Sequence, residues 1–395
     1  MTKYATPEIA TGIYAVGVKD WNRRIFDAIA PTPMGTTYNS YLVKGAAKIA
    51  LIDTVHAGFE DEFSGKIEQV LGSHAIDYLI MNHAEPDHAG LIPYILAKSR
   101  ATLVATEKGV KLAQLYYKVP DDRLRVVADS DTIDLGGKTV RFIHAPHLHW
   151  PETMFTYIPE DRLLFSCDFF GSHNTTGLYD DEAEDVIMWA KKYFGEIMMP
   201  LAKMGQRGME KVRALDVAMI APSHGPIYRH PETILAPYTR WTDGETQPKA
   251  LLVYVSMYHT VERMVLAFAE ILMAEGVEVR LANLVHTDPR ELAGDLVDAR
   301  ALVLGTPTLL GNIHPLAQYA LTIIKTLRPP MKHGVLINSY GWGKGAINKG
   351  LEMLKEAKVE PIGTIEVNGS PNDEDFEHIR ALARQLAGVI LADGK

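Results

Sequence analysis

The sequence predicts an α/β protein built from two domains, and three observations support this prediction. The chain has 395 residues, which is long for one domain and enough for two domains that each bury a core. Short strand-like runs dominate the first 245 residues, whereas strand-like and helix-like runs alternate afterwards. Between them, WTDGETQPKA (241–250) is polar, contains Gly and Pro, and lacks apolar periodicity. We therefore expect one domain at 1–248 and a second at 249–395.

The first domain contains many short apolar runs, several of them preceded by Gly, Asp or Asn, as is typical of strands that follow turns. Helices are expected at 59–71 and 107–118. The expected strands are GIYAV (12–16), YLVKG (41–45), AKIALIDTV (47–55), IDYLIMN (76–82), TLVAT (102–106), TVRFIHA (139–145), MFTYI (154–158), RLLFSC (162–167) and VAMIAPS (217–223).

The second domain alternates strands with helices. An amphipathic run from Val261 to Glu275 predicts the first helix, and it follows the apolar run ALLVYVS (250–256). The further expected strands are VEVRLAN (277–283), ALVLGTP (301–307), GVLINSY (334–340) and PIGTIEV (361–367). Such alternation is the signature of a doubly wound parallel sheet.

Composition and charge narrow the class of protein. Hydrophobic residues make up 47% and charged residues 23% of the chain, as in ordinary globular proteins, and the net charge of −9 is not gathered in a tail. This balance argues against nucleic acid or an anionic membrane as the main partner. The first residues show no basic region followed by an apolar core, and no run reaches the roughly 18 apolar residues of a membrane span, so we expect a cytoplasmic protein. Cys167 is the single cysteine, so a metal site must use imidazole and carboxylate ligands.

The stretch HAEPDH (83–88) places four ligand-type side chains at the end of an expected strand. In an extended segment, His83, Glu85 and Asp87 point to a common side, and His88 turns toward a neighbouring point. That geometry suits two adjacent metal ions. Taken alone, six such residues are equally compatible with a solvated polar loop.

Three more expected strands end in residues of the same type, which makes the polar-loop interpretation improbable. Asp168 follows RLLFSC, and His224 lies in APSHGP after another apolar run. PHLHWPETM supplies both His147 and His149, which share strand parity, so either could face the site. Functional residues gather at such strand ends in layered α/β folds.

Three loops of the second domain predict a mononucleotide site. SMYHTVERM (256–264) follows a strand and opens a helix, so its N–H groups and hydroxyls can surround a phosphate. It has no G-x-G-x-x-G fingerprint, which favours a mononucleotide over a dinucleotide. TPTLLGN (306–312) and SYGWGKG (339–345) also follow expected strands; their small residues permit close backbone approach, and Trp342 offers a stacking face. Singly, each loop could be an ordinary turn.

The first 245 residues resemble the metallo-β-lactamase fold, whose metal motif usually reads H-x-H-x-D-H followed by His, Asp and His. Glu85 stands here at the second motif position, and a carboxylate in place of imidazole favours iron over zinc. Together with GTTYNSYL (35–42), HWPETM (149–154) and the flavodoxin-like second half, Glu85 makes essentially the whole chain resemble the flavodiiron proteins, or A-type flavoproteins. The resemblance implies an N-terminal metallo-β-lactamase-like αββα sandwich followed by a C-terminal flavodoxin-like doubly wound parallel sheet.

The resemblance also implies the roles of individual residues. The family's ligand is the His directly before Trp-Pro, hence His149; His147 would support a ligand or be merely buried, and His173 is the best further candidate for a supporting residue. The implied ligands are His83, Glu85 and His149 for one iron, Asp87, His88 and His224 for the other, and Asp168 as the bridge. The implied FMN contacts are Ser256, Met257, Tyr258, His259, Thr260, Thr306, Pro307, Thr308, Leu309, Gly311, Asn312, Ser339, Tyr340, Gly341, Trp342 and Gly343.

The implied function is reduction of O2 to water, of NO to N2O, or of both, at a diiron site supplied with electrons by FMN. Because the chain lacks the cysteines of a rubredoxin domain, electrons would come from an external donor, either rubredoxin or reduced coenzyme F420, a deazaflavin. A head-to-tail homodimer or a homotetramer would bring the FMN of one subunit beside the irons of another. Two alternatives remain open: a zinc-dependent hydrolase with a regulatory flavodoxin-like domain, and an electron carrier whose first domain holds no metal.

The sequence departs from the family pattern at four places. Val261 replaces a Thr of the phosphate loop, and Leu310-Gly311 replace an Asn-Asn pair near the flavin ring. Asp27 stands where many members have a His close to the diiron pocket. Phe194 stands in the place of a pocket tyrosine, with Tyr193 beside it, so the sequence does not predict the hydrogen bond from that tyrosine to the substrate.

Overall fold

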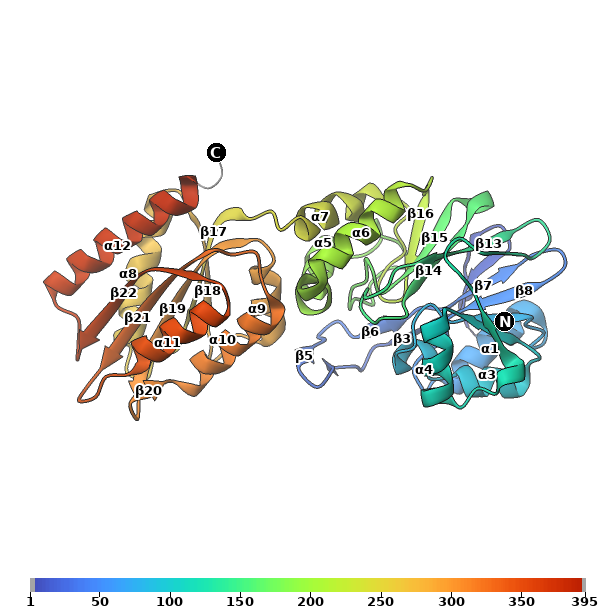
Figure 1. Cartoon of the computed structure of the whole chain (residues 1–395), viewed down its shortest axis with the longest axis horizontal. Coiled ribbons are helices and arrows are strands. Elements are labelled where there is room, and N and C mark those ends of the chain that lie inside the picture. The colour runs from blue at the N-terminus through green and yellow to red at the C-terminus, as the bar shows by residue number, and fades with distance from the viewer. Residues whose placement is uncertain (1–3, 393–395) are drawn as a thin grey trace. The chain divides into compact units, whose positions relative to one another are not determined.

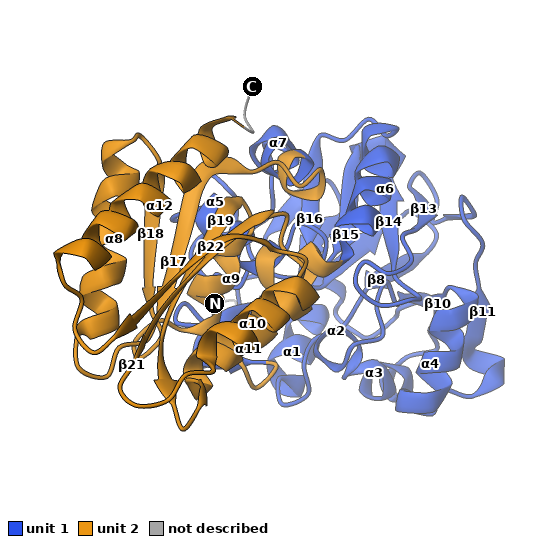
Figure 2. Ribbon diagram, turned by 60° about the vertical axis from the view of Figure 1, so that its left-hand side comes forward, with its two compact units in different colours: residues 1–26, 32–194, 201–239 blue, residues 27–31, 195–200, 240–395 orange. Residues whose placement is uncertain are grey.

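The computed structural model describes residues 4–392. Contacts divide the chain into two compact units (Figure 2). Residues 1–26, 32–194 and 201–239 form unit 1, and residues 27–31, 195–200 and 240–395 form unit 2. The domain limits that we expect from the sequence stay a prediction.

Unit 1 contains two packed sheets. The seven-stranded sheet has the order β1-β2-β7-β8-β9-β10-β11, and the five-stranded sheet has the order β12-β13-β14-β15-β16. Apolar side chains that alternate along the strands of both sheets form one buried cluster between them, including Val43 and Ile80 from one sheet and Phe142 and Phe165 from the other. Figure 1 shows α1, α3 and α4 on one side of this pair of sheets and α6 and α7 on the other. The αββα sandwich predicted from the sequence is confirmed.

The elements of this part of the chain have the following bounds. The strands are β1 (Glu8–Ala10), β2 (Ile13–Ala15), β3 (Val18–Asp20), β4 (Ile25–Phe26), β5 (Ala30–Pro31), β6 (Thr36–Tyr38), β7 (Tyr41–Lys44), β8 (Ile49–Ile52), β9 (Tyr78–Ile80), β10 (Thr102–Ala105), β11 (Leu124–Val126), β12 (Thr132–Asp134), β13 (Thr139–His144), β14 (Met154–Ile158), β15 (Leu163–Cys167) and β16 (Met219–Pro222). The helices are α1 (Glu60–Leu71), α2 (Pro86–Ala89), α3 (Ile92–Lys98), α4 (Glu107–Tyr117), α5 (Val186–Tyr193), α6 (Ala202–Arg213) and α7 (Glu232–Thr242).

The strand directions bring the ligand-bearing loops to one edge of the sandwich. Strand β15 pairs with β16 in parallel, and β13 runs in the same direction because both β13 and β15 are antiparallel to β14. The loops that follow these three strands therefore leave the five-stranded sheet at the same edge. The loop after β9 carries HAEPDH from the other sheet.

Unit 2 is an open parallel sheet of order β18-β17-β19-β21-β22, to which β20 adds an antiparallel pairing with β19. Its core joins the sheet to α8 and α12, which lie along one face, while α10 and α11 lie along the other (Figure 1). The flavodoxin-like sheet predicted from the sequence is confirmed. The bounds are β17 (Gln247–Tyr254), α8 (Thr260–Ala274), β18 (Glu278–Asn283), α9 (Pro289–Leu296), β19 (Ala299–Leu309), β20 (Asn312–Ile313), α10 (Pro315–Leu327), β21 (His333–Tyr340), α11 (Ala346–Glu356), β22 (Glu360–Asn368) and α12 (Asp373–Ala392).

Helix length and polarity also bear on membrane insertion. Among residues 4–392, no helix is both long enough and apolar enough to cross a bilayer.

Candidate metal centre

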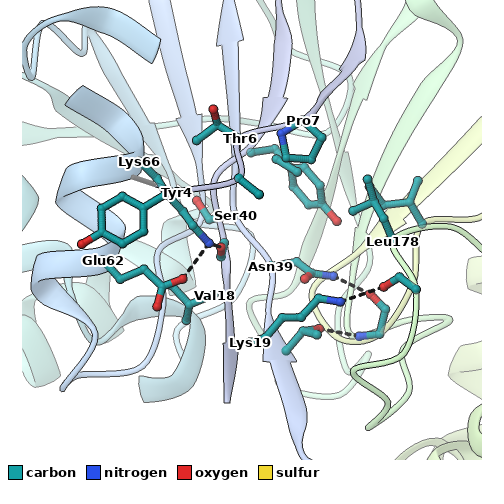
Figure 3. Close-up of a pocket in the computed structure, with 18 of the residues that line it drawn as sticks. Tyr4, Thr6, Pro7, Val18, Lys19, Asn39, Ser40, Glu62, Lys66 and Leu178 are labelled. Carbon is teal, nitrogen blue, oxygen red and sulfur yellow. Dashed lines mark hydrogen bonds and ion pairs between the residues drawn. The ribbon is translucent and has the colours of Figure 1, made fainter. Parts of the chain in front are cut away.

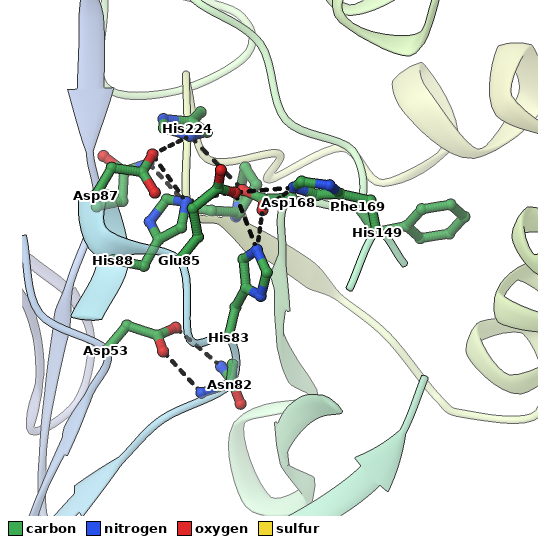
Figure 4. Close-up of polar contacts among 12 residues, drawn as sticks. Asp53, Asn82, His83, Glu85, Asp87, His88, His149, Asp168, Phe169 and His224 are labelled. Atoms are coloured by element: carbon green, nitrogen blue, oxygen red, sulfur yellow. Dashed lines mark hydrogen bonds and ion pairs between the residues drawn. The ribbon is translucent and has the colours of Figure 1, made fainter. Parts of the chain in front are cut away.

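The first of two clusters joins residues from three loops (Figure 4). Nε2 of His83 and Nε2 of His149 lie 3.1 and 3.0 Å from Oε2 of Glu85. Both nitrogens also lie 3.4 Å from Oδ2 of Asp168. Two imidazole nitrogens and two carboxylate oxygens therefore surround one point.

The second cluster lies beside it and uses the rest of HAEPDH. Oδ2 of Asp87 lies 3.3 Å from Nε2 of His88 and 3.1 Å from Nε2 of His224. Oδ1 of Asp168 lies 3.0 and 3.6 Å from the same two nitrogens. Asp168, which follows β15 and is 1% exposed, thus directs one oxygen to each cluster.

The two clusters have the donor set and spacing of a metal site. Two ligands about 2.1 Å from one ion and at right angles to each other lie about 3 Å apart, which is the spacing seen here. Within the described part of the chain, both carboxylate oxygens of Asp87 and of Asp168 are buried without a hydrogen-bond partner, and so are both ring nitrogens of His88. Buried polar atoms are nearly always satisfied, so cations fit these two points better than hydrogen bonds do.

The pKa shifts of the clustered side chains also favour bound cations. Burial lowers the pKa of His88, but the carboxylates of Asp87 and Asp168 outweigh burial and raise that pKa to about 10. Burial raises the pKa of Glu85, yet hydrogen bonds from His149 and His83 hold it well below its usual range. The pocket therefore stabilises positive charge strongly, as either bound protons or metal ions.

The path of HAEPDH differs from our expectation that Asp87 shares a side with His83 and Glu85. Glu85 is extended, but Pro86 starts the short helix α2 (Pro86–Ala89). A helical turn rotates each residue by about 100°, so Asp87 and His88 face the second cluster. The alternation argument was wrong beyond Glu85, because a proline at the first helical position favours a turn.

His147 and His149 take different positions. His149 belongs to the first cluster, whereas His147 is exposed and belongs to neither. The expectation that His147 is buried is wrong. Its backbone N–H donates to the carbonyl of Trp150 at 2.7 Å, so this residue shapes the turn that presents His149.

A second layer of side chains orients the ligands. Oε1 of Glu152 accepts from Nδ1 of His83 at 2.8 Å and from the backbone N–H of Ala84 at 2.9 Å. The carbonyl of Thr37 accepts from Nδ1 of His224 at 2.6 Å. In both rings the Nδ1 proton is held by an acceptor, which leaves Nε2 for the cluster. Sequence reasoning missed Glu152, although it lies in the HWPETM segment.

His173 is also part of this second layer. It is 1% exposed, and its Nδ1 lies 2.8 Å from the hydroxyl of Thr36. The same hydroxyl lies 3.3 Å from Nδ1 of His224, and the two imidazole rings are 4.9 Å apart. The placement agrees with the supporting role expected for His173.

The carboxylate of Asp53 fixes the start of the HAEPDH loop. It accepts from the backbone N–H of Asn82 at 2.7 Å and from the Asn82 amide at 3.2 Å. Burial raises the pKa of Asp53 to about 6, even though the charge of His88 acts to lower it. Asn82 in turn accepts from Thr156 at 2.7 Å, which ties the loop to β14.

The pocket tyrosine that we expected to be lost is present at the neighbouring position. The ring of Tyr193 lies 5.1 Å from His173 and 5.9 Å from His224. Phe194 packs on Tyr238 instead, at 5.3 Å. Burial, followed by the charge of Asp168, raises the pKa of Tyr193 well above its usual value, so its hydroxyl keeps its proton. Asp27 belongs to unit 2, and its effect stays a prediction.

The predicted mononucleotide loops all lie at one edge of unit 2. The first loop follows β17, the third begins at the last two residues of β21, and β17, β19 and β21 are adjacent and parallel. The second segment was expected to follow its strand, which is wrong for residues 306–309: they belong to β19 itself, which continues into a hairpin with β20. A Cβ on Gly345 would collide with the carbonyl of Gly311, so the second and third loops touch. A Cβ on Gly341 or Gly343 would meet no atom of the described chain within 4 Å, which leaves room for a ligand.

The same edge exposes large apolar side chains. Tyr258 is 83%, Leu310 96% and Trp342 99% exposed. At the first loop, the hydroxyl of Ser256 accepts from the backbone N–H of Glu262 at 3.3 Å, in the first turn of α8 (Thr260–Ala274). The N-terminus of a helix of this length, next to an open glycine-rich edge with exposed rings, fits a phosphate and a flat aromatic ring.

Comparisons with known proteins agree with this arrangement. Residues 36–225 match the family model described as ODP family beta lactamase. The chain is 37% identical over 392 residues to a nitric oxide reductase from Moorella thermoacetica, covering 97% of this chain and 98% of that protein. It is 30% identical over 395 residues to a rubredoxin-oxygen oxidoreductase from Megalodesulfovibrio gigas, with 98% of each covered.

Solved structures extend the likeness to three dimensions. The rubredoxin oxygen:oxidoreductase from Desulfovibrio gigas superimposes with a TM-score of 0.94 at 29% identity, covering 98% of this chain and 99% of that chain. The flavodiiron protein from Giardia intestinalis gives a TM-score of 0.93 at 29% identity, covering 99% and 98%. The likeness therefore spans both units.

Proposed function

The chain belongs to the flavodiiron proteins, the type A flavoproteins, and from this premise we propose that it reduces O2 to water, NO to N2O, or both. The observation that carries the proposal is the position of Asp168, whose two oxygens face two separate clusters. A single bridging carboxylate between two ligand sets suits a pair of metal ions that act together.

The seven clustered side chains would hold the two irons. His83, Glu85 and His149 would bind one ion, Asp87, His88 and His224 would bind the other, and Asp168 would bridge them. With Glu85 in place of an imidazole, three carboxylates and four imidazoles form the set, a mixture that suits iron.

FMN would occupy the loop edge of unit 2. Ser256 and Thr260 lie where the phosphate would meet the first turn of α8, and Trp342 offers its exposed face to the ring system. The Leu310-Gly311 pair brings no amide side chain to the ring, so its contacts there would come from the backbone.

When bound, the two ferrous ions and the reduced flavin together supply four electrons, enough to reduce O2 with four protons to two waters, or two NO with two protons to N2O and water. The residues of the chain would determine how the gas reaches the metal ions and how protons are supplied. The side chains of Glu85 and His149 are 21% and 18% exposed, whereas those of the other five ligands are at most 7% exposed. Gas would therefore approach from the first cluster.

Tyr193 would act at the second cluster from the buried side, where its ring lies near His224. Its hydroxyl stays protonated because burial, followed by the charge of Asp168, raises its pKa, so it can donate a hydrogen bond or a proton to the gas in this pocket. Burial of the surrounding rings keeps bulk water away from that side.

We also propose an external electron donor, either rubredoxin or reduced coenzyme F420, and a head-to-tail homodimer or homotetramer. The names of the relatives, among them a rubredoxin-oxygen oxidoreductase, support the donor class. The exposed Tyr258, Leu310 and Trp342 support a partner subunit that covers the flavin edge. A cytoplasmic location is part of the same proposal.

The zinc hydrolase alternative is disfavoured by Glu85. Its carboxylate contacts both imidazoles of the first cluster, whereas the hydrolase motif has a third imidazole there. The metal-free carrier is disfavoured by the seven converging ligands.

One experiment tests the proposal directly. The purified protein is reduced without oxygen and mixed separately with O2 and with NO while flavin and iron absorbance are followed. Rapid reoxidation by at least one gas, with two irons and one FMN per chain, is expected. Zinc in place of iron, or equally slow reaction with both gases, contradicts it.

A further inference from the structure

A cavity of about 900 Å³ lies in unit 1, apart from the metal centre (Figure 3). Its walls come from the segment 4–7, the β2–β3 region, residues 37–41 and helix α1. Among the described residues that line it, none belongs to either cluster. Thr37 and Gly225 separate the cavity from His224. Its volume is within the range of small-molecule sites, roughly 300–1,000 Å³.

Two lysines present their ammonium groups at this cavity. Nζ of Lys66 donates to the carbonyl of Gly17 at 2.6 Å and pairs with Glu62 at 2.8 Å. Nζ of Lys19 donates to the carbonyls of Thr175 and Gly177 at 2.7 and 2.9 Å. An ammonium has three N–H groups, and these contacts use two on each lysine.

The charge of Lys19 is not balanced by a contacting carboxylate. The side chain of Lys66 is only 11% exposed, and the hydrogen-bond partners of Lys19 are neutral carbonyls. Burial, and then the charge of Lys66, lower the pKa of Lys19, while Glu182 offsets only part of this effect. Lys66 already has Glu62 as its countercharge, whereas Nζ of half-buried Lys19 is held by neutral carbonyls. Partly desolvating a cation without a contacting countercharge is costly, so an anion in the cavity would stabilise Lys19 above all.

The rest of the wall is largely apolar. Val18, Leu178 and Ile227 line it, and the ring of Trp21 lies 5.2 Å from Nζ of Lys19. We propose that this cavity is a binding site for a small organic carboxylate with a flat apolar body, whose charge meets Lys19 and Lys66 and whose body packs against this wall. The site is independent of the proposed diiron chemistry.

Calorimetry on the iron- and FMN-loaded protein tests the site with three probes. They are 2-naphthoate, its neutral counterpart 2-naphthamide, and inorganic phosphate, which has charge but no apolar body. One 2-naphthoate per chain is expected to bind about tenfold or more tightly than either other probe, the effect of one charge-assisted contact. Equal affinity for 2-naphthoate and 2-naphthamide, or binding only at several weak sites, overturns the proposal.

Four variants locate the site. Lys66→Met is expected to weaken 2-naphthoate binding about tenfold, and Glu62→Gln to strengthen it, because the change frees Lys66. Ala15→Leu narrows the cavity without touching either lysine and is expected to weaken binding of both naphthalene probes. Lys108→Met, at an exposed lysine outside the cavity, is the control. Affinity that is unchanged in Glu62→Gln and Ala15→Leu, both of which keep the lysines, overturns the proposal even if Lys66→Met does not fold.

Discussion

The carboxylate of Glu152 accepts a hydrogen bond from Nδ1 of His83 at 2.8 Å, while Nε2 of the same ring lies 3.4 Å from Asp168. The two carboxylates therefore contact the two ring nitrogens of one imidazole from opposite sides. Glu152 is 3% exposed and His83 is fully buried, so the contact is strong and shielded from solvent. It fixes the tautomer and the tilt of a ring that would otherwise rotate.

Glu152→Ala should therefore loosen the first metal position without removing a ligand. Supporting carboxylates of this kind are worth about 10- to 100-fold in metal affinity, and we expect a loss in that range. Glu152→Gln should lose less, because its amide oxygen can still accept from His83. Iron content after dialysis against a chelator measures the effect, and Glu107→Gln, at an exposed glutamate, serves as the control. Full iron retention in Glu152→Ala contradicts this role.

Asp168→Ala should empty both positions, since each cluster loses one oxygen ligand. The expected stoichiometry falls from two irons per chain to below one, whereas a change at Glu85 should affect mainly one iron. Metal analysis of the two variants beside Asp122→Asn, an exposed aspartate, distinguishes these outcomes. Loss of a single iron in Asp168→Ala would show that Asp168 does not bridge.

Tyr193→Phe should slow gas reduction while both irons stay bound. The hydroxyl is the only group removed, and one hydrogen bond of about 1.4 kcal/mol changes a rate about tenfold. Turnover with O2 and with NO is compared with that of Tyr116→Phe, an exposed tyrosine. Unchanged rates with both gases would remove Tyr193 from the mechanism.

Trp342→Ala should weaken FMN binding about three- to tenfold, the usual value of one aromatic contact. At 99% exposed, this ring contributes little to the folding of unit 2, so thermal unfolding without FMN should not change. Quenching of free FMN fluorescence gives the dissociation constant, with Trp21→Ala, an exposed tryptophan of unit 1, as the control. An unaltered constant excludes stacking by Trp342.

Most strands could be predicted from the sequence, because an apolar run and the turn residues beside it are neighbours in the chain. Short apolar runs, several of them beside turn-forming residues, predicted β9, β13, β14, β15 and β16, and the ligand-type residues after β9, β13, β15 and β16 predicted the site. The ring orientation of His83 was not predictable, because Glu152 is 69 residues away in the chain and meets it only in the folded sandwich.

The sequence did not show which position supplies the pocket tyrosine, and the reason is different. Tyr193 ends helix α5 (Val186–Tyr193), and Phe194 begins a π-helical turn at 194–198. Such a turn shifts the rotational register of the residues around it. Adjacent aromatic residues in a sequence do not tell which of the two faces the pocket.

His314 should make the stability of unit 2 depend on pH, and a single substitution can test this effect. It precedes α10 (Pro315–Leu327), and its Nδ1 accepts from the backbone N–H of Leu316 at 3.2 Å. Protonation would remove this acceptor and place a positive charge at a helix N-terminus, which is unfavourable. Burial lowers the pKa of His314 below its usual value. Because the folded pKa is the lower one, this stabilisation is fully present above about pH 6.5 and is lost as pH falls through the folded pKa.

His314→Asn should remove that dependence, since Asn caps helices without titrating. Below the folded pKa, the wild-type protein should lose up to about 1 kcal/mol relative to the Asn variant, the value of one helix cap. Urea unfolding of unit 2, followed at several pH values between about 8 and 5, measures the difference. His286→Asn, at an exposed histidine of the same unit, controls for general titration. Parallel pH profiles for wild type and His314→Asn would show that protonation of His314 does not destabilise the start of α10.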